Sequence, residues 1–150
     1  SLNPQLLPEP SRTTAWRRAE VGGANGHGNA RSVATIHSAL ACGSANGVSL
    51  LTDKGRMRAL EQMSNGVDIL LGIPIKWGAA AFALEAPLLY PNAPGHRVAF
   101  WGGQGGSIAL VDFDERMSIS YVMNRWLMGP HELARGQRII AAVYDSLKRG

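Results

Sequence analysis

Hydrophobic residues recur at helical spacing in the first third of the chain. Asn29 is a favourable N-cap residue and Gly43 a favourable helix-ending residue, so a helix is predicted over residues 30–42. The inward-facing positions of this helix are Val33, Ile36, His37 and Leu40. Thr52 and Asp53 then cap a second predicted helix, which runs to about Met63 and ends in a turn over residues 64–66.

Short apolar runs between glycine and proline clusters predict buried strands in the middle of the chain, over residues 77–84 and 98–101. Residues 107–111 and 117–124 flank a polar turn and therefore predict an antiparallel hairpin. Side chains alternate along the second strand of this hairpin, because successive strand residues point to opposite faces. One face carries Met117, Ile119, Tyr121 and Met123.

A closing helix is predicted from about His131 to Leu147. Its buried stripe follows the spacing i, i+3, i+4 and i+7 and consists of Ile140, Val143, Tyr144 and Leu147. The order of elements is helices, an antiparallel sheet of about four strands, and a closing helix. That order predicts an α+β fold, with the closing helix packed on the sheet.

The length of 150 residues argues for a single domain, and the apolar share of 45% is enough to bury a core. Residues 1–20 contain three prolines and few apolar partners, so we expect an extended arm. Residues 21–150 are expected to form the folded unit. Eighteen glycines and eight prolines indicate many loops and tight turns.

Composition and charge exclude several classes of function. The net charge is +4, but the basic residues are scattered and aromatic residues make up 7%, so we expect no nucleic-acid partner. The single cysteine, Cys42, rules out an intrachain disulfide and a cysteine-rich zinc site. The longest apolar run is too short for a membrane span, and no leader-like segment opens the chain, so a cytoplasmic protein is expected.

The common catalytic and cofactor motifs fit poorly. Residues 105–109 come nearest to Gly-x-Ser-x-Gly but lack the last glycine, and residues 26–31 only begin like a dinucleotide-binding loop. The four histidines show no metal-ligand spacing, and His37 is best explained as a core residue. Asp112, Asp114 and Glu115 are interpreted as turn residues. We therefore expect neither a metal nor a cofactor.

One segment remains as a candidate site, at the end of the strand before the hairpin. Its residues are Trp101, Gly102, Gly103 and Gln104, followed by two more glycines. Clustered glycines weaken a strand because glycine loses the most backbone entropy on folding. This loss of stability is expected where a ligand or another backbone must approach the strand closely. A glycine-rich turn with a bulge explains the same pattern equally well, so the residues alone leave both interpretations open.

This segment resembles the third motif of the serine β-lactamase and penicillin-binding-protein superfamily. It is most similar to the class C-like carboxylesterase branch, in which Lys-Thr-Gly is replaced by His-Gly-Gly or Trp-Gly-Gly. Other segments carry the same resemblance, at residues 25–32, 71–78, 107–112 and 121–124. The resemblance implies the C-terminal portion of the β-lactamase/transpeptidase-like fold.

The resemblance also implies a mechanism. In the family, the serine of a Ser-x-x-Lys motif attacks an ester or amide carbonyl, and the acyl-enzyme is then hydrolysed. The third-motif strand lines the cleft, and by position the backbone N–H of Gln104 would form half of the oxyanion hole. Trp101 stands where β-lactamases have lysine, which favours an ester over a lactam substrate because an indole carries no charge.

The sequence contains no Ser-x-x-Lys motif, since Leu51, Ile73 and Asp145 stand three residues before its lysines. We therefore expect a C-terminal segment of a larger enzyme, inactive by itself, whose catalytic serine and lysine are supplied by a complementary N-terminal segment or chain. Residues 90–92 match Tyr-x-Asn but are interpreted as a proline-rich loop. A nucleophilic Ser1 is a weaker alternative. A non-catalytic scaffold protein and an acyltransferase also stay open.

Overall fold

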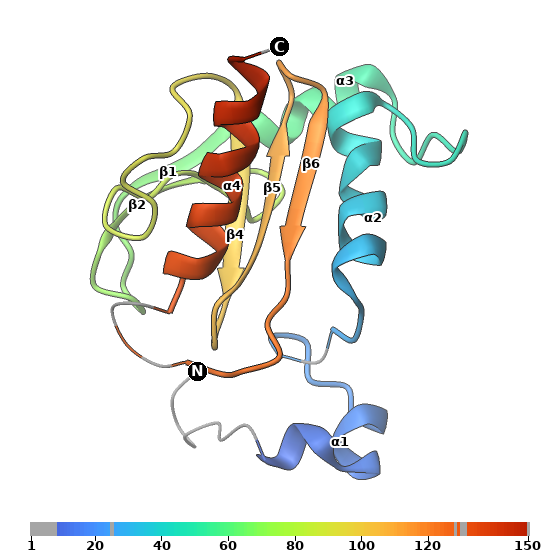
Figure 1. Cartoon of the computed structure of the whole chain (residues 1–150), viewed down its shortest axis with the longest axis vertical. Coiled ribbons are helices and arrows are strands. Elements are labelled where there is room, and N and C mark those ends of the chain that lie inside the picture. The colour runs from blue at the N-terminus through green and yellow to red at the C-terminus, as the bar shows by residue number, and fades with distance from the viewer. Residues whose placement is uncertain (1–8, 25, 128, 130–131, 150) are drawn as a thin grey trace.

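The computed structural model describes residues 9–24, 26–127, 129 and 132–149. Six antiparallel strands form one sheet in the order β1-β2-β3-β4-β5-β6 (Figure 1). The strands are β1 (Gln62–Val67), β2 (Pro74–Gly78), β3 (Ala83–Glu85), β4 (Val98–Gly103), β5 (Ser107–Asp112) and β6 (Met117–Tyr121). The helices are η1 (Glu9–Arg12), α1 (Thr14–Arg18), α2 (Ala30–Cys42), α3 (Asp53–Met57), η2 (Arg58–Leu60) and α4 (Ala134–Leu147). The predicted α+β class is confirmed.

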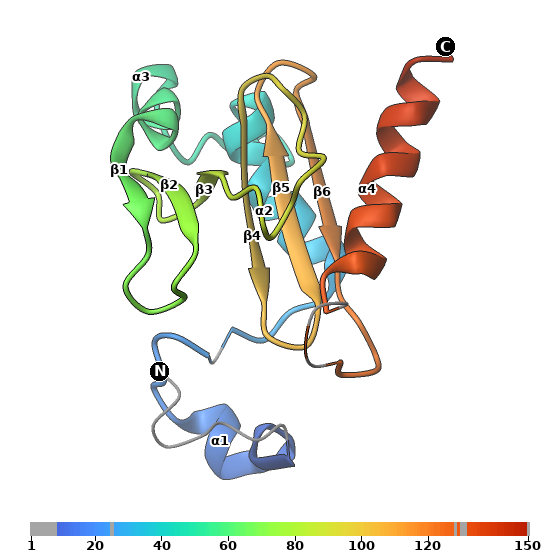
Figure 2. The ribbon, with the colours of Figure 1, turned by 90° about the vertical axis from the view of Figure 1, so that its left-hand side faces the viewer.

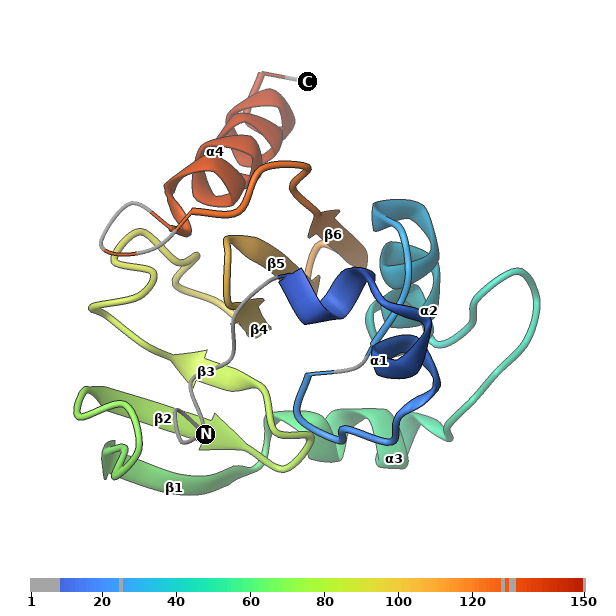
Figure 3. The same ribbon diagram turned by 90° about the horizontal axis from the view of Figure 1, so that it is seen from below.

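Helices cover both faces of the sheet over β4, β5 and β6, with α2 on one side and α4 on the other (Figure 3). Strand alternation divides the core accordingly. Phe100, Leu110 and Ile140 belong to the cluster beneath α4, whereas Ala99 and Val111 belong to the cluster beneath α2. Two thin cores therefore lie on either side of the strand that carries the candidate site.

The predicted hairpin is confirmed, because β5 and β6 pair in register on either side of a turn. Ile119 and Tyr121 pack against the cluster beneath α4, and the Ser118 hydroxyl, on the other face, donates to the carbonyl of Ala34 in α2 at 2.7 Å. A strand side chain reaches a helix carbonyl only where the helix lies close to the sheet. That close approach favours small residues on the inward side of α2.

The predicted α2 is confirmed at both ends. Asn29 accepts a hydrogen bond from the Ser32 amide while the Ser32 hydroxyl accepts one from the Asn29 amide, a capping box, and Gly43 ends the helix with φ 89°. Its predicted inward stripe is partly wrong, because Ile36 is 60% exposed. The buried residues of the helix are Ala39 and Ala41, in keeping with its close contact with β6.

The second predicted helix is shorter than expected, and the sheet is larger. Helical structure ends at Leu60, and Met63 lies in β1 together with the residues predicted as a turn. The apolar run 77–84 is divided between β2 and β3, and β1 is an additional strand, so the sheet has six strands instead of about four. Pairing with β2 decides the conformation of β1, whose residues are exposed throughout and so carry no alternating pattern.

The ends of the chain also differ from expectation. The extended arm predicted for residues 1–20 is wrong for η1 and α1; Thr13 caps α1 by accepting from the amide of Trp16. In Figures 1 and 2, α1 lies beyond the lower end of the sheet. Ile140 is buried as predicted, but Leu147 is 50% exposed. It lies in the last turn of α4, which extends beyond the end of the sheet (Figure 2). Ser1 and His131 lie outside the described residues.

Candidate active site

The candidate site lies at the end of β4 that extends beyond β3 while remaining paired with β5. β3 pairs with β4 at one position only, Ala83 with Phe100, so the described strands offer no ladder partner beyond it on that edge. The carbonyl of Gly103 accepts from the amide of Gly106 at 3.1 Å, on the side of β5. Backbone groups alternate in direction along a strand, so the amide of Gly102 points toward the edge that β3 leaves uncovered.

The four glycines of this segment divide into two pairs with different roles. Gly105 and Gly106 are buried and have φ values of 95° and 109°, where only glycine is unstrained. A Cβ on Gly105 would lie 2.7 Å from the Trp126 ring, and one on Gly106 would clash with the carbonyl of Glu132. Close approach of Met123, Trp126 and Glu132 therefore explains Gly105 and Gly106 without a ligand. The expectation that glycine makes room for a ligand then applies only to Gly102 and Gly103.

Gly102 and Gly103 have different surroundings. A Cβ on Gly102 would lie 2.7 Å from Cδ2 of Leu133, so one face of β4 is covered at this point. A Cβ on Gly103 would lie 2.6 Å from the hydroxyl of Ser107, and both Gly103 and Gln104 are exposed. The accessible part of the predicted site is thus the strand edge and the turn.

Glu132 holds that turn in place. Its Oε1 accepts a hydrogen bond from the amide of Gly105 at 2.7 Å, and the carbonyl of Gly105 accepts one from the amide of Leu127 at 3.3 Å. A turn held by a carboxylate has its amide directions set in advance. Nothing in the sequence pointed to Glu132, because it stands 27 residues from Gly105.

Trp101 is stacked against a second tryptophan that sequence reasoning did not connect to it. The rings of Trp77 and Trp101 lie 4.7 Å apart at an interplanar angle of 50°, and both side chains are half-buried. Nε1 of Trp77 donates to Oδ2 of Asp68 at 3.1 Å. The amide of Leu71, and with it the Trp77 ring N–H, lowers the pKa of the Asp68 carboxyl. The site therefore includes residues of the β1–β2 hairpin.

Two residues weighed from the sequence have structural roles. Nδ1 of His37 donates to the carbonyl of Val33 at 2.7 Å, which confirms His37 as a packing residue with a satisfied hydrogen bond. Tyr90 is buried and stands edge-to-face with Phe100 at 5.2 Å; burial raises the pKa of Tyr90 to about 12. Within the described ranges, no three histidine, cysteine or acidic side chains gather as metal ligands would.

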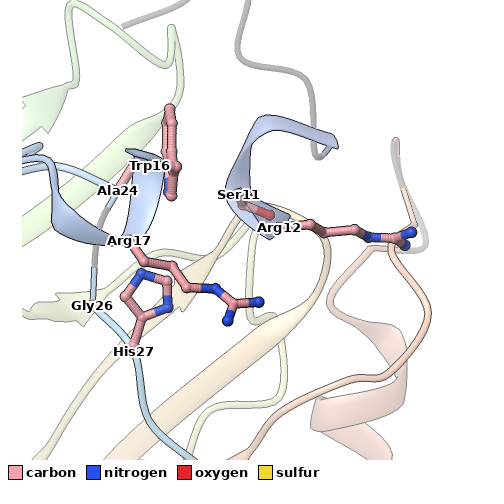
Figure 4. A pocket seen from close by; sticks show the side chains of 7 residues that line it. All are labelled: Ser11, Arg12, Trp16, Arg17, Ala24, Gly26 and His27. Atoms are coloured by element: carbon pink, nitrogen blue, oxygen red, sulfur yellow. The ribbon is translucent and has the colours of Figure 1, made fainter. Parts of the chain in front are cut away.

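Two surface depressions lie elsewhere. The larger, of about 730 Å³, is formed by the segment around α1, where Arg17 extends beside the His27 ring (Figure 4). It is lined by Ser11, Arg12, Trp16, Arg17, Ala24, Gly26 and His27. The other, of about 460 Å³, borders Gly43 and residues 49–53. Neither includes Trp101–Gln104.

No helix in the described part of the chain has the length and apolar character needed to cross a membrane.

Comparison with solved structures gives two informative matches. A family VIII carboxylesterase superposes with a TM-score of 0.85 at 32% identity, over 96% of this chain and 38% of that chain. A penicillin-binding protein homologue from Caulobacter crescentus superposes with a TM-score of 0.67 at 36% identity, over 77% of this chain and 31% of that one. The chain has the β-lactamase/transpeptidase-like fold.

The resemblance predicted from the sequence is therefore confirmed at the level of fold and superfamily. The β-lactamase-like chain spans about a third of the length of each of these two structures. No protein-family model and no curated protein sequence matches it.

Proposed function

We propose that this β-lactamase-like chain is part of a serine hydrolase that cleaves carboxylic esters through an acyl-enzyme. The observation that carries the proposal is the placement of Trp101, Gly102 and Gly103 at the end of β4, beyond its pairing with β3, in a fold shared with a carboxylesterase at 32% identity. Esters are favoured over amides and lactams because Trp101 occupies the position at which the β-lactamases carry lysine.

Each residue of the segment has a role in this proposal. A serine hydroxyl attacks the ester carbonyl, its proton passes to a neighbouring base, and the carbonyl oxygen takes the negative charge. The Gln104 N–H donates to that oxygen. The C–O bond to the alcohol then breaks as the base passes its proton to the leaving oxygen. Water, giving a proton to the same base, attacks the acyl-serine carbonyl, and the acid leaves as the serine oxygen takes the proton back. Gly102 and Gly103 let the substrate lie along the strand edge.

The nucleophile in this proposal comes from polypeptide outside the printed sequence, which contains no Ser-x-x-Lys. β6 is the last strand of the sheet, and among the described residues it pairs only with β5. An added strand could extend the sheet there, because an edge strand presents unpaired backbone groups. We propose that the complementary N-terminal segment docks on the chain through this edge.

A chimera tests the function. This chain replaces the matching 38% of the family VIII carboxylesterase, and hydrolysis of p-nitrophenyl acetate is measured. We expect ester hydrolysis and labelling by a fluorophosphonate in the chimera, and neither in this chain alone. A folded chimera that is labelled but hydrolyses no ester would contradict the proposal, and would favour the non-catalytic scaffold instead.

Two variants of Gln104 test the role of its backbone amide, one as the test and the other as the matched control. Gln104→Pro removes the backbone N–H, whereas Gln104→Ala keeps it and changes only the side chain. The loss of one oxyanion donor is expected to lower kcat by about 100- to 1,000-fold in the proline variant. Equal activity of the two variants would contradict the role of the amide. Product analysis with competing alcohols separates hydrolysis from acyl transfer.

A further inference from the structure

We propose that Trp77, held by Asp68, is a positioning residue that orients Trp101, and that the two indoles bind the apolar part of the ester substrate. The inference rests on the proposed function and adds a substrate class to it, namely esters with an alkyl or aryl acyl group. It draws on a contact between two separate parts of the sheet, the β1–β2 hairpin and the end of β4.

The indole pair lies beside the edge at which β4 is unpaired. β2 and β4 are separated in the sheet by β3, whose Ala83 pairs with both Trp77 and Phe100. The rings of Trp77 and Trp101 lie 4.7 Å apart across this intervening strand. Tilted aromatic pairs at this distance are stabilising beyond the area they bury. The Trp101 ring is therefore oriented by a partner from another strand.

Asp68 fixes the Trp77 ring in turn. Its Oδ2 accepts from Nε1 of Trp77 at 3.1 Å, while its Oδ1 accepts from the amides of Leu70 and Leu71 at 3.0 and 2.9 Å. Its own amide donates to the carbonyl of Ile73 at 2.9 Å. A carboxylate with three donors has little rotational freedom, so it holds the indole in one orientation.

The hairpin that carries Trp77 also carries exposed apolar residues. Ile69, Leu70 and Leu71, at the tip of the same hairpin, are 100%, 67% and 44% exposed, and consecutive exposed apolar residues on one loop are typical of a binding surface. Lys76, the residue before Trp77, forms an ion pair with Glu85 of β3, so its charge is already compensated. These features favour an apolar acyl group over a charged one.

The orientation of the pair can be measured on the chain itself. Two coupled indoles give a couplet in the far-ultraviolet circular dichroism spectrum. We expect Trp77→Phe and Trp101→Phe each to abolish it, whereas Trp16→Phe leaves it unchanged. Asp68→Asn, which keeps an oxygen for the two leucine amides but loses the acceptor for Trp77, is expected to reduce it. An unchanged couplet in Asp68→Asn would overturn the positioning role.

The substrate class is tested in the carboxylesterase chimera with p-nitrophenyl acetate and butyrate. Each buried methylene contributes about 0.8 kcal/mol, so two correspond to a preference of up to about 15-fold for butyrate in kcat/KM. We expect Trp77→Phe and Asp68→Asn to reduce this preference at least about threefold, through a higher KM for butyrate. An unchanged preference in both variants would overturn the inference.

This result is distinguishable from failure of the proposed function. Gln104→Pro is expected to lower kcat for both esters by the same factor and to leave their ratio unchanged. A chimera with no esterase activity overturns the function and the substrate class together, while the circular dichroism couplet still decides whether Asp68 and Trp77 orient Trp101.

Discussion

Nε2 of His96 lies 2.7 Å from Oδ2 of Asp112, a carboxylate with no exposed surface. The hydroxyl of Tyr144 in α4 donates to the same oxygen, and the amides of Asp114 and Glu115 donate to Oδ1 at 3.0 and 2.8 Å. Asp112 therefore joins the loop before β4, the β5–β6 turn and the closing helix. Burial raises the pKa of Tyr144, and the hydrogen bond to the Asp112 carboxylate raises it further.

Removal of this carboxylate is expected to cost more stability than any surface ion pair. Asp112→Ala leaves the Tyr144 hydroxyl and two turn amides without their acceptor, so we expect the free energy of unfolding to fall by about 3 kcal/mol or more. Chemical denaturation measures it. Asp145→Ala is the control, because Asp145 forms an exposed pair with Lys148 at 3.9 Å, with an expected cost below about 0.5 kcal/mol. Similar losses in the two variants would contradict the role of Asp112.

Alkaline pH is expected to destabilise the chain through Tyr90. Burial raises the pKa of Tyr90 from 10.0 to about 12, so the unfolded chain loses its phenolic proton at a lower pH than the folded one. The stabilisation is present below pH 10 and is lost as pH rises toward 12, by about 1 kcal/mol per pH unit. We expect Tyr90→Phe to reduce this pH dependence in denaturation experiments; parallel profiles for the two proteins would contradict it.

Gly106 is expected to be irreplaceable for structural reasons. Gly106→Ala places a Cβ against the carbonyl of Glu132 at φ 109°, so we expect a loss of about 2 kcal/mol or more in thermal or chemical unfolding. Gly95→Ala is the control, because Gly95 is exposed and has nothing within 4 Å of its Cβ position. Its expected effect is neutral or slightly stabilising. Equal stability of the two variants would show that the turn tolerates a side chain.

Two serines on the same face of β6 are expected to respond oppositely to removal of the hydroxyl. Ser118→Ala loses the bond to the Ala34 carbonyl, at a cost of about 1 kcal/mol. The buried Ser120 hydroxyl has no hydrogen-bond partner within the described residues, so Ser120→Ala is expected to be neutral or stabilising. Denaturant midpoints of the two variants check the difference, and a larger loss at Ser120 would contradict it.

Local patterns predicted α2, the β5–β6 hairpin and α4 because each carries its own signal. Asn29 and Gly43 mark the ends of α2, and β5 and β6 join across a short turn. β1 lacked such a signal, since its residues are exposed on both faces and it exists through pairing with β2. Exposed edge strands of this kind are defined by their neighbour, which a single sequence does not display.

At the candidate site, too, the sequence predicted the local feature but not its neighbours in space. The glycines at 102–106 pointed to an unusual strand end, but a glycine pattern does not distinguish a ligand from another segment of the chain. Trp126 and Glu132 proved to be the neighbours of Gly105 and Gly106, and Trp77 the neighbour of Trp101. Asp112 was interpreted as a turn residue, but it is the buried last residue of β5, and its Oδ1 accepts from the amides of the turn. Its bonds to His96 and Tyr144 were missed.

The sequence by itself determined the α+β class, the ends of α2, the hairpin of β5 and β6, and the superfamily, because these depend on periodicity, capping residues and motifs that are contiguous in the chain. Only the tertiary structure decided which glycines face another segment, which carboxylate is buried and which ring lies against Trp101. Those relationships depend on residues that meet only when β3 brings β2 and β4 together, and when α4 closes on the sheet.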